Sequence, residues 1–164
     1  MYKEGSANPE ALNEAIVSYM ASVQKPSAVR RNLSYRDFLS DRMLLVQAIR
    51  AGVPYRLFAL IKNESPFTDE EWADFLSISV KSLQRYKAAR DYQFRSSHSE
   101  KIFEIAEVTE LGRSVFESNE KFLLWLSTPG FSLGNLKPMD LIRDSYGKEM
   151  VINELHRIDQ AIFV

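Results

Sequence analysis

Apolar residues recur along most of this chain every three or four positions, the spacing that places them on one face of a helix. Strict alternation of apolar and polar residues, which indicates a half-buried strand, forms no convincing segment. The expected helices cover residues 9–23, 40–51, a segment that Pro54 opens, segments that Thr68 and Ser79 cap, and residues 99–116, 119–127, 138–142 and 145–158. In residues 40–51, the expected buried stripe is Met43, Leu44, Val46 and Ile49. We therefore expect an all-α fold.

Local start and stop signals support these boundaries. Asn8 precedes a proline at the first helical position, and Thr68 has Glu71 three residues later, the capping-box pattern. Gly52 is well placed as a helix C-cap. Residues 24–32 contain a proline and three basic residues, which predicts a linker. The expected organisation is an N-terminal helix and linker at 1–32, a larger helical domain at 33–116 and a smaller one at 117–164.

Residues 68–90 predict two short helices joined by a tight turn, a helix-turn-helix pattern. From Ser79 to Arg95 the chain has five basic residues and one acidic residue, a local net charge of +4. Such a stripe favours contact with nucleic acid, although a solvated helix face also carries Lys and Arg without binding DNA. The candidate DNA-binding residues, of types that contact phosphates and base edges, are Ser79, Lys81, Ser82, Gln84, Arg85 and Lys87.

Composition limits the remaining possibilities. The 164 residues are 45% hydrophobic, which is enough for a buried core, and 21 Lys+Arg against 22 Asp+Glu leave a net charge of -1. No global field therefore attracts nucleic acid, and any such site is a local patch. The absence of cysteine excludes disulfides and thiolate metal sites. No apolar run approaches the roughly 18 residues of a membrane span, and we expect a cytoplasmic protein without a membrane partner.

The polar residues do not form a recognisable catalytic or metal-binding pattern. His98 and His156 have no nucleophile spaced to suggest a triad. The acidic residues of the last segment lack an Asp-x-Asp or His-rich spacing, so surface positions explain them better than a metal site. They are Asp140, Asp144, Glu149 and Glu154. We expect neither enzyme activity nor a metal or cofactor.

Residues 122–142 form the most distinctive stretch of the sequence. An apolar run that contains Trp125 ends at Thr128 and Pro129, and Pro138 begins the next helix. Between the prolines, Gly130 or Gly134 supplies a positive φ angle. The pattern is explained by a capped corner between helices, and it is also compatible with a surface shaped for a partner.

The C-terminal third carries an ordered series of motifs. Trp-Leu-x-Thr-Pro at 125–129 precedes Leu-Gly-Asn at 133–135 and Pro-x-Asp-Leu-Ile at 138–142, and Gly147 and Leu-x-Arg-Ile at 155–158 follow. In this order the motifs resemble the toxin-binding domain of the Xre/MbcA/ParS-type antitoxins, the partners of RES-domain toxins. Residues 67–87 are similar to the Xre-like helix-turn-helix of that family, with Tyr86 where a second basic residue is frequent.

The resemblance implies an all-helical, non-catalytic antitoxin that dimerises and covers the active site of an NAD-depleting RES toxin with its C-terminal domain. It also implies repression of its own operon through operator DNA. The NAD chemistry would belong to the toxin, so this chain needs no cofactor. The toxin-binding residues we expect are Leu133, Asn135, Lys137, Arg157, Phe163 and Val164.

Two other functions stay open at this point. The chain is alternatively a DNA-binding regulator whose C-terminal domain mainly dimerises, or a non-catalytic scaffold whose helix-turn-helix only packs against that domain. A neighbouring gene that encodes a RES domain would distinguish the antitoxin from both.

Overall fold

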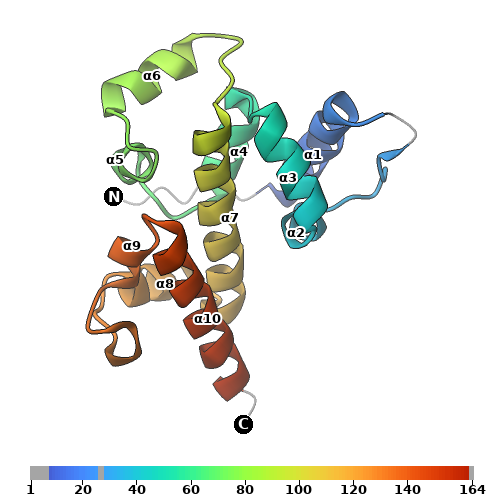
Figure 1. Cartoon of the computed structure of the whole chain (residues 1–164). Helices are drawn as coiled ribbons and strands as arrows, with labels where there is room; N and C mark the ends of the chain where they lie inside the picture. The colour runs from blue at the N-terminus through green and yellow to red at the C-terminus, as the bar shows by residue number, and fades with distance from the viewer. Residues whose placement is uncertain (1–7, 26–27, 163–164) are drawn as a thin grey trace. The chain divides into compact units, whose positions relative to one another are not determined.

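The computed structural model describes residues 8–25 and 28–162, and helices make up most of them (Figure 1). The chain separates into two compact units, residues 1–103 and 104–164, and the long helix α7 (Ser96–Phe116) contributes to both. Within the described ranges, extended pairing is limited to two isolated bridges, Pro54 with Gln93 and Gly130 with Leu136. The expected all-α fold is confirmed.

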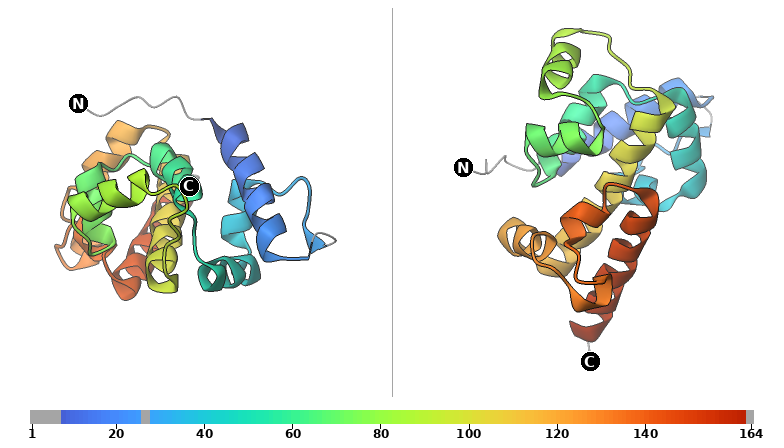
Figure 2. Two further views of the ribbon diagram at one scale, coloured as in Figure 1. Left: turned by 90° about the horizontal axis from the view of Figure 1, so that it is seen from above. Right: turned by 60° about the vertical axis from the view of Figure 1, so that its left-hand side comes forward.

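The first unit begins with six helices that precede α7. They are α1 (Pro9–Val23), α2 (Tyr35–Ser40), α3 (Arg42–Ala51), α4 (Tyr55–Glu64), α5 (Asp69–Phe75) and α6 (Val80–Ala88). The α1 helix packs against α2, α3 and α4 (Figure 2). Its residues Leu12, Ile16 and Met20 are fully buried. The α1 helix, which was predicted from sequence to lie outside the main domain, therefore contributes to the core of this unit.

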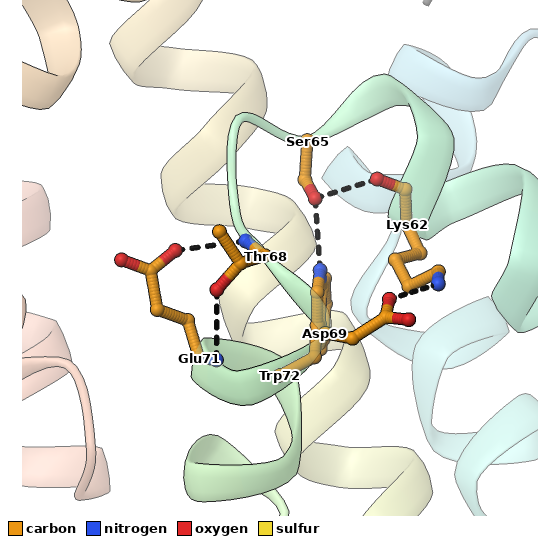
Figure 3. A network of polar contacts seen from close by, with 6 residues as sticks. All are labelled: Lys62, Ser65, Thr68, Asp69, Glu71 and Trp72. Atoms are coloured by element: carbon orange, nitrogen blue, oxygen red, sulfur yellow. Dashed lines mark hydrogen bonds and ion pairs between the residues drawn. The ribbon is translucent and has the colours of Figure 1, made fainter. Parts of the chain in front are cut away.

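Caps fix the ends of several helices where the sequence predicted them. The side chain of Asn8 accepts a hydrogen bond from the Ala11 amide at 3.2 Å, and Gly52 ends α3 with a φ of 87°. At α5, Thr68 Oγ1 accepts from the Glu71 amide at 3.2 Å, and the Glu71 carboxylate accepts from the Thr68 amide at 2.8 Å (Figure 3). These bonds satisfy amides that a helix start otherwise leaves unpaired.

A polar network also holds the connection between α4 and α5. The indole Nε1 of Trp72 donates to Ser65 Oγ at 2.9 Å, and Ser65 Oγ donates to the Lys62 carbonyl at 2.7 Å (Figure 3). Lys62 and Asp69 form an ion pair across the same connection. Trp72 itself is fully buried and packs edge-on against Phe58. The start of the helix-turn-helix is thereby fixed to the aromatic core.

The structure adds a helix, α2, in front of the one predicted at residues 40–51. The predicted helix begins at Arg42 as α3, because the Asp41 carboxylate caps it through the amides of Met43 and Leu44. The predicted buried stripe was wrong, because Met43 is 63% exposed and Val46 39% exposed, whereas Leu45 and Ala48 are buried. Both faces of α3 carry apolar residues, and packing against α1 and α2 decides which one is inside.

The second unit contains the C-terminal half of α7 followed by four further elements. They are α8 (Asn119–Leu126), the 3-10 turn η2 (Phe131–Leu133), α9 (Pro138–Leu141) and α10 (Ser145–Ile162). Ser145 Oγ donates to Glu104 at 2.9 Å, and Lys148 Nζ pairs with Glu107 at 2.6 Å. Because both bonds advance together along the two helices, α10 runs parallel to this half of α7 (Figures 1 and 2).

The two long helices extend beyond their predicted limits. Residues 96–98 belong to α7, and residues 159–162 continue α10. At the start of α10, Gly147 lies so close to α9 that a Cβ atom would be 2.0 Å from the Leu141 carbonyl oxygen. Only glycine permits this approach, which explains the position of Gly147 within the motif series.

Candidate functional site

The helix-turn-helix of the first unit consists of α5, residues 76–79 and α6. In the turn, Ser77 has a φ of 54°, and the Ile78 amide donates to the Ala73 carbonyl at 2.9 Å. Leu83 is 2% exposed and forms the inner face of α6, while Lys81, Gln84, Arg85 and Lys87 are exposed. The predicted polar face of the second helix is therefore directed to solvent.

The two serines at the start of α6 also have a structural role. Ser79 Oγ accepts from the Ser82 amide at 3.0 Å and donates to Ser82 Oγ at 3.0 Å, so both hydroxyls take part in the cap. The amides of this first turn and the positive end of the helix macrodipole both favour an anion such as a phosphate. Ser79 is exposed and Ser82 half-buried, which leaves the N-terminus of α6 accessible.

An aromatic stack attaches α6 to the segment that follows it. The rings of Tyr86 and Tyr92 lie 3.7 Å apart and nearly parallel, at 7°, and the Arg85 guanidinium lies 5.5 Å from the centre of the Tyr86 ring. The hydrogen bond from Tyr92 lowers the pKa of Tyr86, while burial raises the pKa of Tyr92 to about 12. Tyr86 thus has a packing role at the end of α6.

In the second unit, residues 130–136 form a corner that is closed by backbone hydrogen bonds. The amides of Leu133 and Asn135 both donate to the Gly130 carbonyl, at 3.0 and 2.9 Å, and the Leu136 amide donates to the Leu133 carbonyl at 3.2 Å. Gly134 and Asn135 have φ angles of 67° and 60°, as the two central residues of a type I′ turn require. Gly134, and not Gly130, therefore supplies the positive φ at the glycine position.

A carboxylate on α10 connects this corner to the rest of the unit. Glu154 Oε1 accepts from Ser132 Oγ at 2.8 Å and from Arg157 Nη2 at 2.5 Å, and Glu154 Oε2 accepts from Arg157 Nε at 2.9 Å. The bonds from Arg157 and Ser132 hold the pKa of Glu154 below its ordinary value of 4.5. The corner and α10 are thereby joined by a charged group that stays ionised at neutral pH.

Two protein families match the chain, one over most of the first unit's later helices and the other within the second unit. Residues 44–107 match the Antitoxin Xre-like helix-turn-helix domain, and residues 111–160 match the Antitoxin Xre/MbcA/ParS C-terminal toxin-binding domain. The chain carries the two domains of an Xre/MbcA/ParS-type antitoxin. Both families are regulatory binding domains and not enzymes. Among curated proteins, no relative matches the chain.

Each match contains one of the exposed features described above. The first match contains α5, the turn and α6, while α1 and α2 lie before it. The second contains the corner, α9 and α10 as far as residue 160. The antitoxin therefore presents a helix-turn-helix with an exposed basic face in one domain, and a hydrogen-bonded corner in the toxin-binding domain.

The predicted toxin-binding residues have different positions in that domain. Leu133 is 3% exposed, so its side chain packs inside the corner and does not offer a surface contact, which corrects the expectation for this residue. Asn135 and Lys137 are exposed on the corner and at the start of α9, and Arg157 is exposed on α10. Phe163 and Val164 lie outside the described residues.

Exposed apolar side chains of the second unit were missed by the sequence reasoning. Phe131 is 92% exposed at the start of η2, and Leu136 is 53% exposed where the corner ends. On α10, Tyr146 is 85% and Met150 44% exposed, one turn apart. A phenylalanine between a glycine and a serine, outside any helical stripe, is the signal that points to Phe131.

Other kinds of site find no support in the described parts of the antitoxin. Over residues 8–25 and 28–162, no three His, Cys, Asp or Glu side chains gather in a way that suits a metal ion. Among the helices of those ranges, none combines the length and apolar character needed to cross a bilayer. The exposed surfaces of the two domains are therefore the functional candidates.

Proposed function

We propose that this antitoxin neutralises a RES-type toxin, one that depletes NAD, by covering the active site of the toxin with the corner and α10. The observation that carries the proposal is Phe131, which is 92% exposed on a rigid corner inside the match to a toxin-binding domain. Because the corner is closed by its own backbone hydrogen bonds, little conformational entropy is lost when it binds. Phe131 and Leu136 are the apolar anchors of this surface.

Exposed polar groups lie beside these anchors in the corner, and Arg157 is linked to the corner through Glu154 and Ser132. Asn135, Lys137 and Arg157 are exposed and can donate hydrogen bonds to the toxin at the edge of the apolar contact. The chain beyond α10, which contains Phe163 and Val164, would enter the active-site cleft. The NAD chemistry belongs to the toxin, and the antitoxin acts by exclusion of substrate.

The test of this surface is Phe131→Ser in the full chain, assayed with the purified toxin. Because exposed aromatic anchors concentrate binding energy, we expect the affinity to fall roughly 10- to 100-fold, with a matching loss of inhibition in an assay of NAD consumption. The thermal midpoint should not change, since the side chain is almost entirely in solvent.

Met43→Ser is the matched control, because Met43 is an exposed apolar residue of the first unit. It should bind and inhibit the toxin as the unmodified chain does. An unaltered affinity in Phe131→Ser would exclude the corner as the contact surface. Deletion of residues 157–164 should abolish inhibition, and intact inhibition after this deletion would contradict occlusion of the active site.

We also propose that the antitoxin is a homodimer and represses its own operon through α6. The exposed Lys81, Arg85 and Lys87 on α6 support the DNA contact, and the homodimer is proposed from the resemblance alone. Arg85→Ala combined with Lys87→Ala should remove salt-dependent binding to the operon's promoter, as measured by fluorescence anisotropy. Equal affinity for any DNA duplex would mean that the binding is non-specific attraction between charges and would contradict repression through a specific operator.

A further inference from the structure

Glu154 makes contacts on both sides of the proposed toxin-binding surface. Its side chain is only 11% exposed, whereas the side chain of Arg157 is 65% exposed. The carboxylate accepts two hydrogen bonds from Arg157 in a fork and a third from Ser132, with distances between 2.5 and 2.9 Å. Ser132 directly follows Phe131 in the corner. One largely buried carboxylate therefore binds both Ser132, the neighbour of Phe131, and the exposed guanidinium of Arg157.

We propose that Glu154 is a positioning residue of the toxin-binding surface, which holds the corner through Ser132 and the Arg157 guanidinium through its fork. This inference rests on the proposed function of the corner. Arginine has a long side chain with many rotamers, and ordering it at the moment of binding lowers affinity. A guanidinium already fixed by two hydrogen bonds loses less entropy when the toxin arrives.

The same contact defines the kind of toxin group that Arg157 recognises. Glu154 uses one edge of the guanidinium, so the opposite N–H groups stay available to a partner. The charge of Arg157 is already balanced by Glu154, and a carboxylate from the toxin would lie near a second negative charge. A neutral acceptor, such as a backbone carbonyl or a hydroxyl, therefore fits this position.

If Glu154 only stabilised the fold, its substitution would affect stability and toxin affinity differently. The Arg157 side of this ion pair is largely in solvent, and an ion pair between residues three apart on a helix contributes little to stability when water screens it. Loss of the pair should therefore not unfold the domain. If Glu154 acts through Arg157 and Ser132, substitution of Glu154 should no longer change toxin affinity once both of those side chains have been removed. These two expectations separate positioning from a general structural contribution.

The experiment measures toxin affinity and inhibition of NAD consumption for the full chain. Glu154→Ala should weaken toxin binding at least 10-fold, and Glu154→Gln should weaken it less because an amide oxygen still accepts a hydrogen bond. In an Arg157→Ala, Ser132→Ala background, Glu154→Ala should have an effect below about twofold, because the groups it positions are absent. Glu149→Ala, an exposed acidic residue on the same helix, is the control and should bind normally.

Exchange of the Arg157 Nε–H proton, followed by NMR in the unbound chain, reports positioning directly. The proton should be protected in the unmodified chain and in Phe131→Ser, and it should exchange faster in Glu154→Ala. Unchanged affinity in Glu154→Ala, or an equal effect of this change in both backgrounds, would overturn the proposal. A gain in affinity for Glu154→Gln would show that a toxin carboxylate, rather than a neutral acceptor, faces Arg157.

Failure of the proposed function gives a different result. In that case the unmodified chain itself would neither bind nor inhibit the toxin, before any variant is measured. If the unmodified chain inhibits the toxin while Glu154→Ala inhibits equally well, the function stands and the positioning role does not.

Discussion

The hydroxyl of Tyr19 shows how one side chain secures α1 to the first unit. It is hydrogen-bonded to the Ala48 carbonyl at 3.0 Å and to the Gly52 carbonyl at 2.7 Å, at the C-terminal end of α3. Burial raises the pKa of Tyr19 from 10.0 to about 12. The sequence placed Tyr19 on the apolar face of its helix, but its polar partners lie about 30 residues away and depend on tertiary packing.

Tyr19→Phe should lower the free energy of unfolding by about 1 kcal/mol, the usual contribution of a buried hydrogen bond. The loss stays moderate because the Gly52 amide and the Gln93 side chain still donate to the two carbonyls. Urea unfolding at neutral pH, with circular dichroism as the signal, measures the change. A loss of several kcal/mol would mean that the ring no longer packs in place.

The raised pKa of Tyr19 also predicts a dependence on pH. The folded chain keeps the phenol proton up to a higher pH than the unfolded chain, so the contribution to stability is complete below pH 10. That contribution is lost as pH rises from 10 to about 12. Over this interval, stability should decline less steeply in Tyr19→Phe than in the unmodified chain, as followed by thermal unfolding.

At the scale of elements, α6 depends on a start signal that the sequence specifies and on a packing partner that it does not. Ser79 caps the helix, and this was predictable because the bond spans only three residues. The stack of Tyr86 on Tyr92 was not predictable, because it depends on the path of the chain after α6. The cap and the stack fix the exposed basic face from both ends.

Two substitutions of Ser79 separate the cap from DNA contact. Ser79→Ala should lower stability by about 1 kcal/mol because the Ser82 amide loses its acceptor. Ser79→Asp keeps an acceptor and suits the positive end of the helix, so stability should be retained. Its negative charge should nevertheless weaken promoter binding. Thermal unfolding and fluorescence anisotropy give the two readouts, and normal promoter binding by Ser79→Asp would place the phosphates away from this end of α6.

At the scale of the whole molecule, the two surfaces belong to different compact units. The basic residues that favour DNA lie on α6 and in the segment after it, within a chain of net charge -1. The exposed apolar residues of the corner and the Glu154 contacts lie in residues 104–164. The contacts described for Arg85 and for Glu154 lie within their own units, so the effects of substitutions in the two surfaces should be independent.

Paired binding measurements test this independence. Phe131→Ser should leave promoter affinity unchanged within about twofold, and Arg85→Ala with Lys87→Ala should leave toxin affinity unchanged by the same measure. The chain with all three substitutions should lose both activities and still unfold at the same temperature. A change in promoter affinity for Phe131→Ser in the absence of toxin would reveal coupling between the two surfaces.

The amino-acid sequence by itself determined the all-α class, the capped starts at Asn8, Thr68 and Ser79, the turn at Gly134 and Asn135, and the motif order of both antitoxin domains. These features follow from bonds between residues that are close in sequence, and residue types carry that information directly. Tertiary structure decided which apolar residues are inside. Met43 and Phe131 are exposed and Leu133 is buried because packing between elements that are distant in sequence decides which apolar side chains are covered. Helical periodicity carries no information about that packing.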